Sequence, residues 1–362
     1  MPELVTPHWI NRLVRRDERG LTAVIVSDSQ ADGFSNGDSA GVKDFRDTWP
    51  GLLADTFGDR VGVPVGKWIP ADTPNAVHAN YEFVTTSWDS GATHVDRTGD
   101  SNGVPGSVWL NNGSPSSQSK SLTWDLDDST VAVDVILGGY PEYGTSDVTI
   151  TITPVGGTPV DHVVTPDTHV WRWSTANAVG IESVMVSDSV AGVQVYGIVE
   201  YEDISKLGFH VYNFGFANKP AADFALYTDA TLGTELPTLI AEIAPDVVII
   251  DLAGNDYAQG YTPAQLQASL ETIVGNVLVE SPLSDVFFLD HDYADQTGAV
   301  APWADYRAAI VAAATATGTF VQTTQYTTPQ GSEGLFTSDG VHYTLSGARS
   351  VSDAVMPALY PR

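Results

Sequence analysis

The 362-residue sequence contains no cysteine, so disulfides, thiolate-bound zinc, iron–sulfur clusters and cysteine nucleophiles are excluded. Basic residues are also scarce, since 16 Lys and Arg stand against 45 Asp and Glu to give a formal net charge of -29. A field of this sign repels phosphate backbones and anionic lipid head groups, so nucleic acid is a poor partner and a neutral substrate is favoured. Only 17% of residues are charged and 43% are hydrophobic, which is typical of a folded protein with an acidic surface.

The sequence also lacks long apolar runs. No stretch reaches the roughly 18 apolar residues that span a membrane, and the first twenty residues contain no apolar run of signal-peptide length. We therefore expect a soluble protein, with any export depending on another route or leader. An acidic, cysteine-free and β-rich composition suits an extracellular enzyme or a virion-associated one such as a phage-tail protein.

The periodicity of the sequence predicts an α/β protein interrupted by a β-rich insertion. Residues 21–26 are a continuous apolar run typical of a buried parallel strand, and residues 43–58 have helical spacing with Gly58 as the expected stop. Between residues 66 and 204, period-two runs alternate with turn formers, which favours an antiparallel β-sandwich or jelly roll. The α/β pattern then resumes, with strands expected at 208–213, 246–252, 285–289 and 319–322, and helices at 219–242, 263–279, 302–317 and 344–358. A short helix is also expected near the start of the chain, at 7–18.

Three polar segments carry the candidate chemistry, because each ends a buried strand or opens the terminal helix, where open α/β sheets place their ligands. They are Ser27-Asp28-Ser29, Gly254-Asn255-Asp256 and Asp339-Gly340-Val341-His342. A serine hydroxyl becomes a nucleophile when an imidazole takes its proton, and the imidazole needs a partner that fixes its tautomer. Asp339 and His342 are three residues apart and can present both side chains from one turn, so the pattern predicts a Ser, Asp, His triad with Ser29 as nucleophile.

These segments together resemble the sequence blocks of the SGNH (GDSL-like) hydrolase superfamily over residues 20–62 and 207–358. The matching residues are Asp28, Ser29 and Gly33 in the first block; Trp49, Pro50, Leu53, Ala54 and Gly58 in the helix that follows; Asn213, Gly215 and Asn218 in the second block; Asn255 and Asp256 in the third; and Asp339, Gly340 and His342 in the fifth, with Gly347 behind it. Any one block is a weak signal, but all of them in order are a strong one.

The resemblance implies a fold and a role for each matched residue. The fold is a three-layer α/β/α, flavodoxin-like hydrolase domain built from residues 1–65 and 205–362, with the jelly-roll-like domain of residues 66–204 between. Ser29 would be the nucleophile, His342 the general base and Asp339 the residue that orients it, with no cofactor and no metal. The oxyanion would be held by the Ser29 backbone N–H, the Asn255 side chain and a backbone N–H of the second block.

Three positions depart from the family pattern. Ser27 stands where the family usually has Gly, and Ala253 replaces the Gly before the third block. Asn218 occupies the place of the second-block Gly, but a backbone N–H is present in any residue except Pro, and Asn tolerates unusual φ values. The sequence leaves open whether Gly215 or Asn218 supplies the second oxyanion donor.

Several of these residues, and two further segments, have a second interpretation. Taken alone, Ser29 also suits a helix N-cap and His342 a surface histidine. Ser35 lies in a Gly-x-Ser-x-Gly pattern, but that nucleophile elbow must follow a strand immediately and this one does not. Asp290-His291-Asp292 contains metal-ligand types, yet adjacent residues point to different sides, so we interpret it as a segment at the rim of the site.

The inserted aromatics bear on the substrate. Most of these side chains are expected in the core of the sandwich, and the alternative is that they form a sugar-stacking platform. The tryptophans concerned are Trp88, Trp109, Trp124, Trp171 and Trp173. Some polysaccharide O-acetylesterases of the superfamily look similar in carrying a β-sandwich beside the site, so the expected substrate is a short acyl ester, most plausibly an O-acetyl group on a glycan. The alternatives are a lipase or thioesterase for longer chains, and a non-catalytic glycan-binding or structural protein with a degenerate hydrolase domain.

Overall fold

The structure is a computed structural model. It describes residues 7–16, 18–28, 31, 45–71, 81–82, 108–110, 120–139, 147–188, 193–216, 218–232, 235–291, 298–323 and 342–360.

A parallel sheet forms the centre of the molecule, and its order places the end of β1 at a topological switch point. Its strands are β1 (Leu21–Ser27), β2 (Val65–Pro70), β12 (Phe209–Gly215), β13 (Val247–Asp251), β14 (Asp285–Asp290) and β15 (Phe320–Thr323). They lie in the order β15-β14-β13-β1-β12-β2, all parallel. The β12-β1-β13-β14-β15 part has the flavodoxin-like 2-1-3-4-5 order, in which ligands bind beyond the carboxyl end of the first strand.

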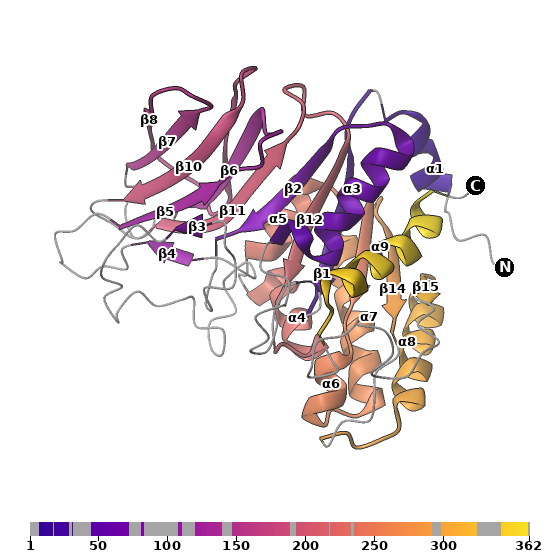
Figure 1. The fold of residues 1–362 in the computed structure, drawn as a ribbon. Helices are drawn as coiled ribbons and strands as arrows, with labels where there is room; N and C mark the ends of the chain where they lie inside the picture. Colours follow the sequence, from indigo (N-terminus) through magenta and orange to yellow (C-terminus); the bar gives the residue numbers. More distant parts are fainter. Residues whose placement is uncertain are drawn as a thin grey trace.

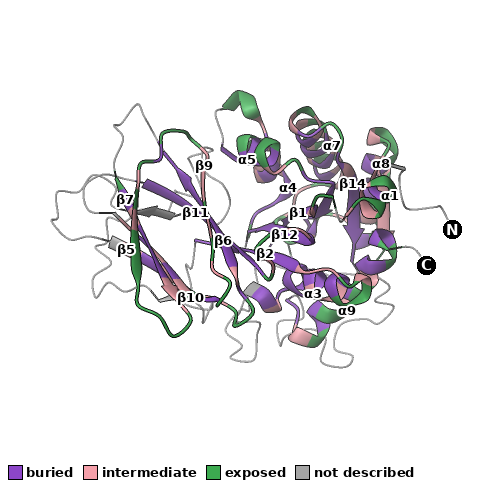
Figure 2. Ribbon diagram, turned by 90° about the horizontal axis from the view of Figure 1, so that it is seen from above, coloured by how far each residue is buried: buried purple, intermediate pink, exposed green. Residues whose placement is uncertain are grey.

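Helices cover both faces of this sheet, as expected for strands that are apolar on both sides (Figure 2). One face is covered by α1 (Pro7–Val14), α3 (Trp49–Val61) and α9 (Leu345–Leu359), and the other by α4 (Ala221–Tyr227), α5 (Glu235–Ile243), α7 (Pro263–Glu280) and α8 (Trp303–Thr317). Three short elements complete the α/β part: η1 (Phe45–Asp47), η3 (Ala230–Leu232) and α6 (Gly254–Gln259). The predicted three-layer α/β fold is confirmed.

The strands of the insertion fall in two sheets, and one of these continues the parallel sheet (Figure 1). β11 (Val193–Tyr201) pairs antiparallel with β2, and is followed by β6 (Ala132–Gly138) and β9 (Trp171–Ala176), while β4 (Val108–Leu110) also pairs with β11. The second sheet is wholly antiparallel, in the order β3 (Tyr81–Glu82), β5 (Lys120–Asp125), β10 (Ile181–Asp188), β7 (Val148–Pro154) and β8 (Val160–Val164). The division into residues 1–65, 66–204 and 205–362 stays a prediction, and its first boundary falls inside β2.

One of the two hydrophobic clusters in the described part of the chain joins both sheets to the layer of α4, α5, α7 and α8. Trp124 of the second sheet and Tyr196 of the first are fully buried in the same cluster as Phe214 at the end of β12. The Trp124 indole Nε1–H donates to the Pro70 carbonyl at 3.3 Å, so this aromatic is a core residue. Trp171 and Trp173 are half-buried against the cluster, and the side chains of Trp88 and Trp109 lie outside the described residues.

The boundaries of α3 differ from the predicted 43–58 for a local reason. The helix runs from Trp49 to Val61, and Gly62 ends it with a left-handed φ of 72°, the usual use of glycine at a helix C-terminus. Gly58 lies inside the helix because it faces β2, where an added Cβ would come within 2.5 Å of the Val65 Cγ1. The predicted stop was therefore a packing glycine.

The helix expected over residues 219–242 is divided. It ends at Tyr227, and the Asp229 side chain then accepts hydrogen bonds from the Thr231 backbone N–H at 2.9 Å and hydroxyl at 2.7 Å. Such local bonds offer the backbone a turn in place of a helix. Two helices, α4 and α5, therefore stand where one was predicted.

Candidate active site

The segment that bears the candidate nucleophile begins at the end of β1 and is held against β12. Ser29 itself lies outside the described residues, as does Asp339. On one side of it, the Phe216 N–H donates to the Ser27 carbonyl at 3.0 Å. On the other side, the buried Asn213 amide donates to the Ala31 carbonyl at 2.8 Å. The residues before and after Ser29 are thus anchored to the same strand end.

The second-block residues Asn213, Gly215 and Asn218 differ in conformation and in hydrogen bonding. The Gly215 N–H donates to the Asn213 side-chain oxygen at 2.9 Å. Asn218 has a φ of 63°, in the left-handed region that favours glycine and that Asn also adopts. This explains how Asn can stand at a position where the family has Gly.

Helix α6 is hydrogen-bonded to the segment that follows β12. The Asn255 side chain donates to the Lys219 carbonyl at 3.1 Å, and the buried Asp256 carboxylate accepts the Ala221 N–H at 2.9 Å, at the start of α4. Gln259 donates to the Asn218 carbonyl at 3.1 Å. Three side chains of α6 therefore bind residues 218–221, which follow β12.

Ala253, which precedes α6, has a strained backbone. Its φ is 142°, a conformation that L side chains rarely adopt, and its methyl group is buried. Such strain typically costs about 1–3 kcal/mol and is often found at functional sites. The replacement of the family's Gly by Ala is thus not a neutral change in this backbone.

We expect Ala253→Gly to leave the free energy of unfolding unchanged or raise it by about 1 kcal/mol, because relief of strain outweighs the lost methyl burial. The matched control is Ala313→Gly, at a fully buried position of α8 with ordinary helical backbone, which should lose about 1–2 kcal/mol. Urea denaturation measures both. An equal loss in the two variants would contradict the strain at Ala253.

Burial raises the pKa of Asp256 from its ordinary value of 3.8 to about 6, although the bond from the Ala221 N–H opposes the rise. The folded state therefore binds a proton more tightly than the unfolded state. This contribution to stability is complete below pH 3.8 and is lost as the pH rises through about 6.

Asp256→Asn should remove that dependence, because the amide oxygen still accepts from Ala221 without carrying charge. Relative to the native protein, we expect the variant to gain up to about 2–3 kcal/mol in unfolding free energy between pH 4 and pH 8. Chemical denaturation at a series of pH values measures the difference. A difference that does not vary with pH would show that Asp256 is not the titrating group.

The candidate base lies in the turn before α9. His342 is buried, and two residues later the Thr344 hydroxyl accepts the Gly347 N–H at 3.2 Å and caps the helix. Tyr343, between them, has its hydroxyl 3.0 Å from the Nδ1 of the buried His291. The turn that bears His342 is thus fixed from both sides.

A buried chain of polar groups connects this turn to the end of β1. The His291 Nε2 lies 2.5 Å from one Asp251 carboxylate oxygen, and the Ser27 hydroxyl donates to the other at 3.1 Å. Burial by itself lowers the pKa of an imidazole, but Asp251, with Asp290 and Asp28, raises the pKa of His291 above its ordinary 6.5. The sequence blocks mark Ser27 only as a departure from the family pattern and do not include Asp251 or Tyr343.

The interpretation of residues 290–292 as a rim segment was wrong for the two residues described. Asp290 and His291 are both buried. Arg307 of α8 donates to Asp290 from two nitrogens, at 2.9 and 2.6 Å, and the Trp303 indole donates to the His291 carbonyl at 2.9 Å. Among the described residues no group of three or more His, Asp or Glu side chains could hold a metal ion.

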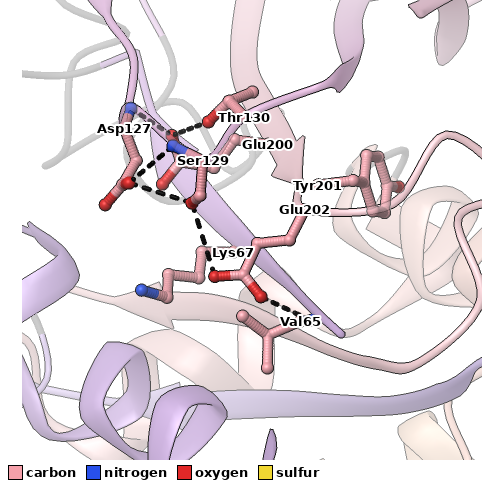
Figure 3. Close-up of a pocket in the computed structure, with 8 residues that line it drawn as sticks. All are labelled: Val65, Lys67, Asp127, Ser129, Thr130, Glu200, Tyr201 and Glu202. Atoms are coloured by element: carbon pink, nitrogen blue, oxygen red, sulfur yellow. Dashed lines mark hydrogen bonds between the residues drawn. The ribbon is translucent and has the colours of Figure 1, made fainter. Parts of the chain in front are cut away.

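A second polar region lies at the junction of β2 and β11 (Figure 3). The pocket is lined by Val65, Lys67, Asp127, Ser129, Thr130, Glu200, Tyr201 and Glu202. Its charged groups bind one another or their neighbours: Arg46 of η1 pairs with both Glu200 oxygens at 2.5 and 2.7 Å, and Lys67 pairs with Asp55 at 2.7 Å. These contacts fasten β11 to η1 and β2 to α3, which is a structural role.

No described helix is long and apolar enough to cross a membrane.

Comparison with known proteins gives structural matches but no sequence match. No protein-family model and no curated protein matches the chain. The structure of a peptidoglycan O-acetylesterase aligns with 97% of this chain and 95% of its own, at a TM-score of 0.66 and 12% identity. TesA is a partial likeness, with a TM-score of 0.36, 25% identity, and coverage of 43% of this chain and 81% of its own. A family two carbohydrate esterase from Cellvibrio japonicus has a TM-score of 0.32, 10% identity, and coverage of 81% of this chain and 98% of its own. The chain therefore shares its fold with this peptidoglycan O-acetylesterase over almost its whole length.

Proposed function

We propose that this protein is a serine esterase in which Ser29 is the nucleophile, His342 the general base and Asp339 the residue that orients the base. The observation that supports this most is the meeting of the described block residues at one edge of the sheet. Hydrogen bonds connect the segments on both sides of Ser29 to the end of β12, and further bonds connect the loop after β12 to α6. The chain through Tyr343 connects the His342 turn to the same edge.

In the proposed reaction the Ser29 hydroxyl attacks the ester carbonyl while His342 takes its proton. The tetrahedral intermediate collapses as His342 gives that proton to the departing alkoxide oxygen, leaving an acyl group on Ser29. A water molecule then attacks the acyl carbon while His342 takes its proton, and His342 gives that proton to the departing Ser29 oxygen as the acid is released. Asp339 holds the tautomer of His342 throughout.

We assign the oxyanion donors to the Ser29 N–H, the Asn255 side chain and the Asn218 N–H. Gly215 is the weaker candidate because its N–H already donates to Asn213. Asn218 has the left-handed backbone expected of the glycine it replaces. Asn255 carries two side-chain N–H donors, so its bond to the Lys219 carbonyl uses one and orients the other. Each such donor typically stabilises the transition state by about 3 kcal/mol.

For the substrate we propose O-acetyl groups on a glycan. The aligned peptidoglycan O-acetylesterase covers almost the whole chain, so the likeness includes the strands of the insertion as well as the hydrolase part. The net charge of -29 favours a neutral ester over a polyanionic one. The half-buried Trp171 and Trp173 of β9 are the described aromatics of the insertion that could contact a sugar ring.

Acetate release tests this proposal. We expect the protein to release acetate from O-acetylated glycans, and to hydrolyse p-nitrophenyl acetate faster than the butyrate, octanoate and palmitate esters. The Ser29→Ala variant assayed in parallel controls for contaminating esterases. Rates that rise with chain length would favour the lipase or thioesterase alternative, and no hydrolysis of any ester would leave the non-catalytic alternative.

A further inference from the structure

Four side chains that the proposed reaction does not use, Ser27, Asp251, His291 and Tyr343, form a continuous chain between the end of β1 and the turn that bears His342. Ser27, two residues before the candidate nucleophile, binds Asp251 at the end of β13. Asp251 binds His291 after β14, and His291 contacts Tyr343, the residue next to the candidate base. The chain crosses from β1 through two neighbouring strand ends to the turn before α9.

The chain is built from groups that are costly to bury, which argues that its geometry is closely fixed. Ser27, Asp251 and His291 are each no more than 3% exposed. A buried polar group without a partner costs about 1–3 kcal/mol, so each member depends on its neighbour for satisfaction. Movement of either end would break a bond that water cannot replace.

The imidazole at its centre is held from several elements at once. Asp251 of β13, Asp290 of β14 and Asp28 at the end of β1 all act electrostatically on the His291 ring. Trp303 of α8 binds its carbonyl, and Arg307 of the same helix binds Asp290. The His291 ring is therefore bound by Asp251 and Tyr343, while α8 binds its backbone carbonyl and the neighbouring Asp290.

We propose that His291, acting through Asp251 and Tyr343, is a positioning residue that fixes the His342 turn relative to the end of β1 that leads to Ser29. The inference rests on the proposed function for its catalytic consequence. A serine and its base must meet within hydrogen-bond reach, and a misplacement of about 1 Å can cost 100-fold in rate. The chain supplies a link between their two segments that does not depend on the Ser–His contact itself.

This role also accounts for Ser27, where the family usually has Gly. A glycine there has no hydroxyl to give to Asp251, and the link to β1 would end one residue short. The departure from the family pattern and the His291–Asp251 pair are therefore parts of one arrangement.

The test uses graded substitutions in the full chain, assayed with p-nitrophenyl acetate. Tyr343→Phe removes only the hydroxyl, and we expect kcat to fall about tenfold with KM within twofold of the native value. His291→Leu breaks both bonds, and we expect a fall in kcat of about 100-fold. His291→Gln keeps one donor and one acceptor and should retain a kcat between these two. His169→Gln, in a histidine–carboxylate pair with Glu235 that is not a member of the chain, is the control and should keep the native rate.

Two further readouts separate positioning from a loss of folded protein. The double variant Ser27→Ala, Tyr343→Phe should lose no more kcat than the worse of the two single variants, because both cut one chain. The NMR signal of the His342 ring should broaden or divide in Tyr343→Phe while the melting temperature changes little.

The inference would be overturned if Tyr343→Phe and His291→Gln kept the native kcat and the native His342 signal, or if the effects of Ser27→Ala and Tyr343→Phe were simply additive. A loss in His291→Leu alone, matched by a fall in melting temperature, would also overturn it. These results would leave an active native protein and hence the proposed function. An inactive native protein would instead contradict the proposed function. In that case the NMR signal of the His342 ring in Tyr343→Phe would still test whether the chain fixes the His342 turn.

Discussion

Ser29→Ala should lower kcat for ester hydrolysis by a factor on the order of 10⁴ or more, because no other group can form the acyl intermediate. The melting temperature should stay close to that of the native protein, since removal of one hydroxyl leaves the buried strand β1 unchanged. Steady-state kinetics with p-nitrophenyl acetate and thermal unfolding measure the two quantities.

Ser35→Ala is the matched control, because Ser35 lies in the Gly-x-Ser-x-Gly pattern that resembles a different nucleophile motif. It should keep the native kcat within about twofold. A fully active Ser29→Ala variant, or an inactive Ser35→Ala variant, would refute the assignment of the nucleophile.

The second large effect is expected at Asn255. Asn255→Ala should lower kcat by about 10²–10³ with little change in KM, because an oxyanion donor acts mainly on the transition state. The side chain also binds the Lys219 carbonyl, so part of any loss could come from a displaced loop.

Gln259→Ala separates the two effects. Gln259 binds the same loop through the Asn218 carbonyl, from the exposed end of α6. Its replacement should cost less than tenfold in kcat if the Asn255 effect is catalytic. Equal losses in Asn255→Ala and Gln259→Ala would mean that Asn255 only supports the loop, and the oxyanion assignment would be withdrawn.

The strands of the α/β part could be predicted closely from the sequence because they are buried on both faces. The run at 21–26 is β1, and the runs at 246–252 and 285–289 match β13 and β14 within two residues. A continuous apolar run bounded by turn formers has few alternatives in a chain of alternating strands and helices. The same reasoning located the carboxyl edge of the sheet, where the described candidate residues Gly215, Asn218 and Asn255 lie.

Helix boundaries were less predictable because they depend on contacts distant in sequence. Gly58 looks like a helix stop until β2 is packed against it, and the actual stop is Gly62. The short helix α6 was not predicted, since six residues carry too little periodicity to identify a helix. The continuity of the sheet from β2 into β11 is likewise a long-range pairing that no local pattern encodes.

The candidate site, like the fold, could be predicted only in part from the sequence. The sequence blocks predict which residues belong to it, and the described ones, Gly215, Asn218, Asn255 and His342, lie on segments that meet at this edge or are hydrogen-bonded to it. The supporting chain was not predicted, because Asp251 resembles any residue at a strand end and His291 resembles part of a surface segment. Only their pairing across neighbouring strands distinguishes them.

Covalent labelling with a fluorophosphonate tests the central claim most directly. The reagent reacts with a serine only where a base activates it and an oxyanion site receives the phosphonyl oxygen. We predict one adduct per chain by intact mass, located on Ser29 by peptide mapping, and absent from Ser29→Ala and strongly slowed in His342→Ala. No adduct on the native protein, or an adduct on another serine that persists in Ser29→Ala, would contradict the account.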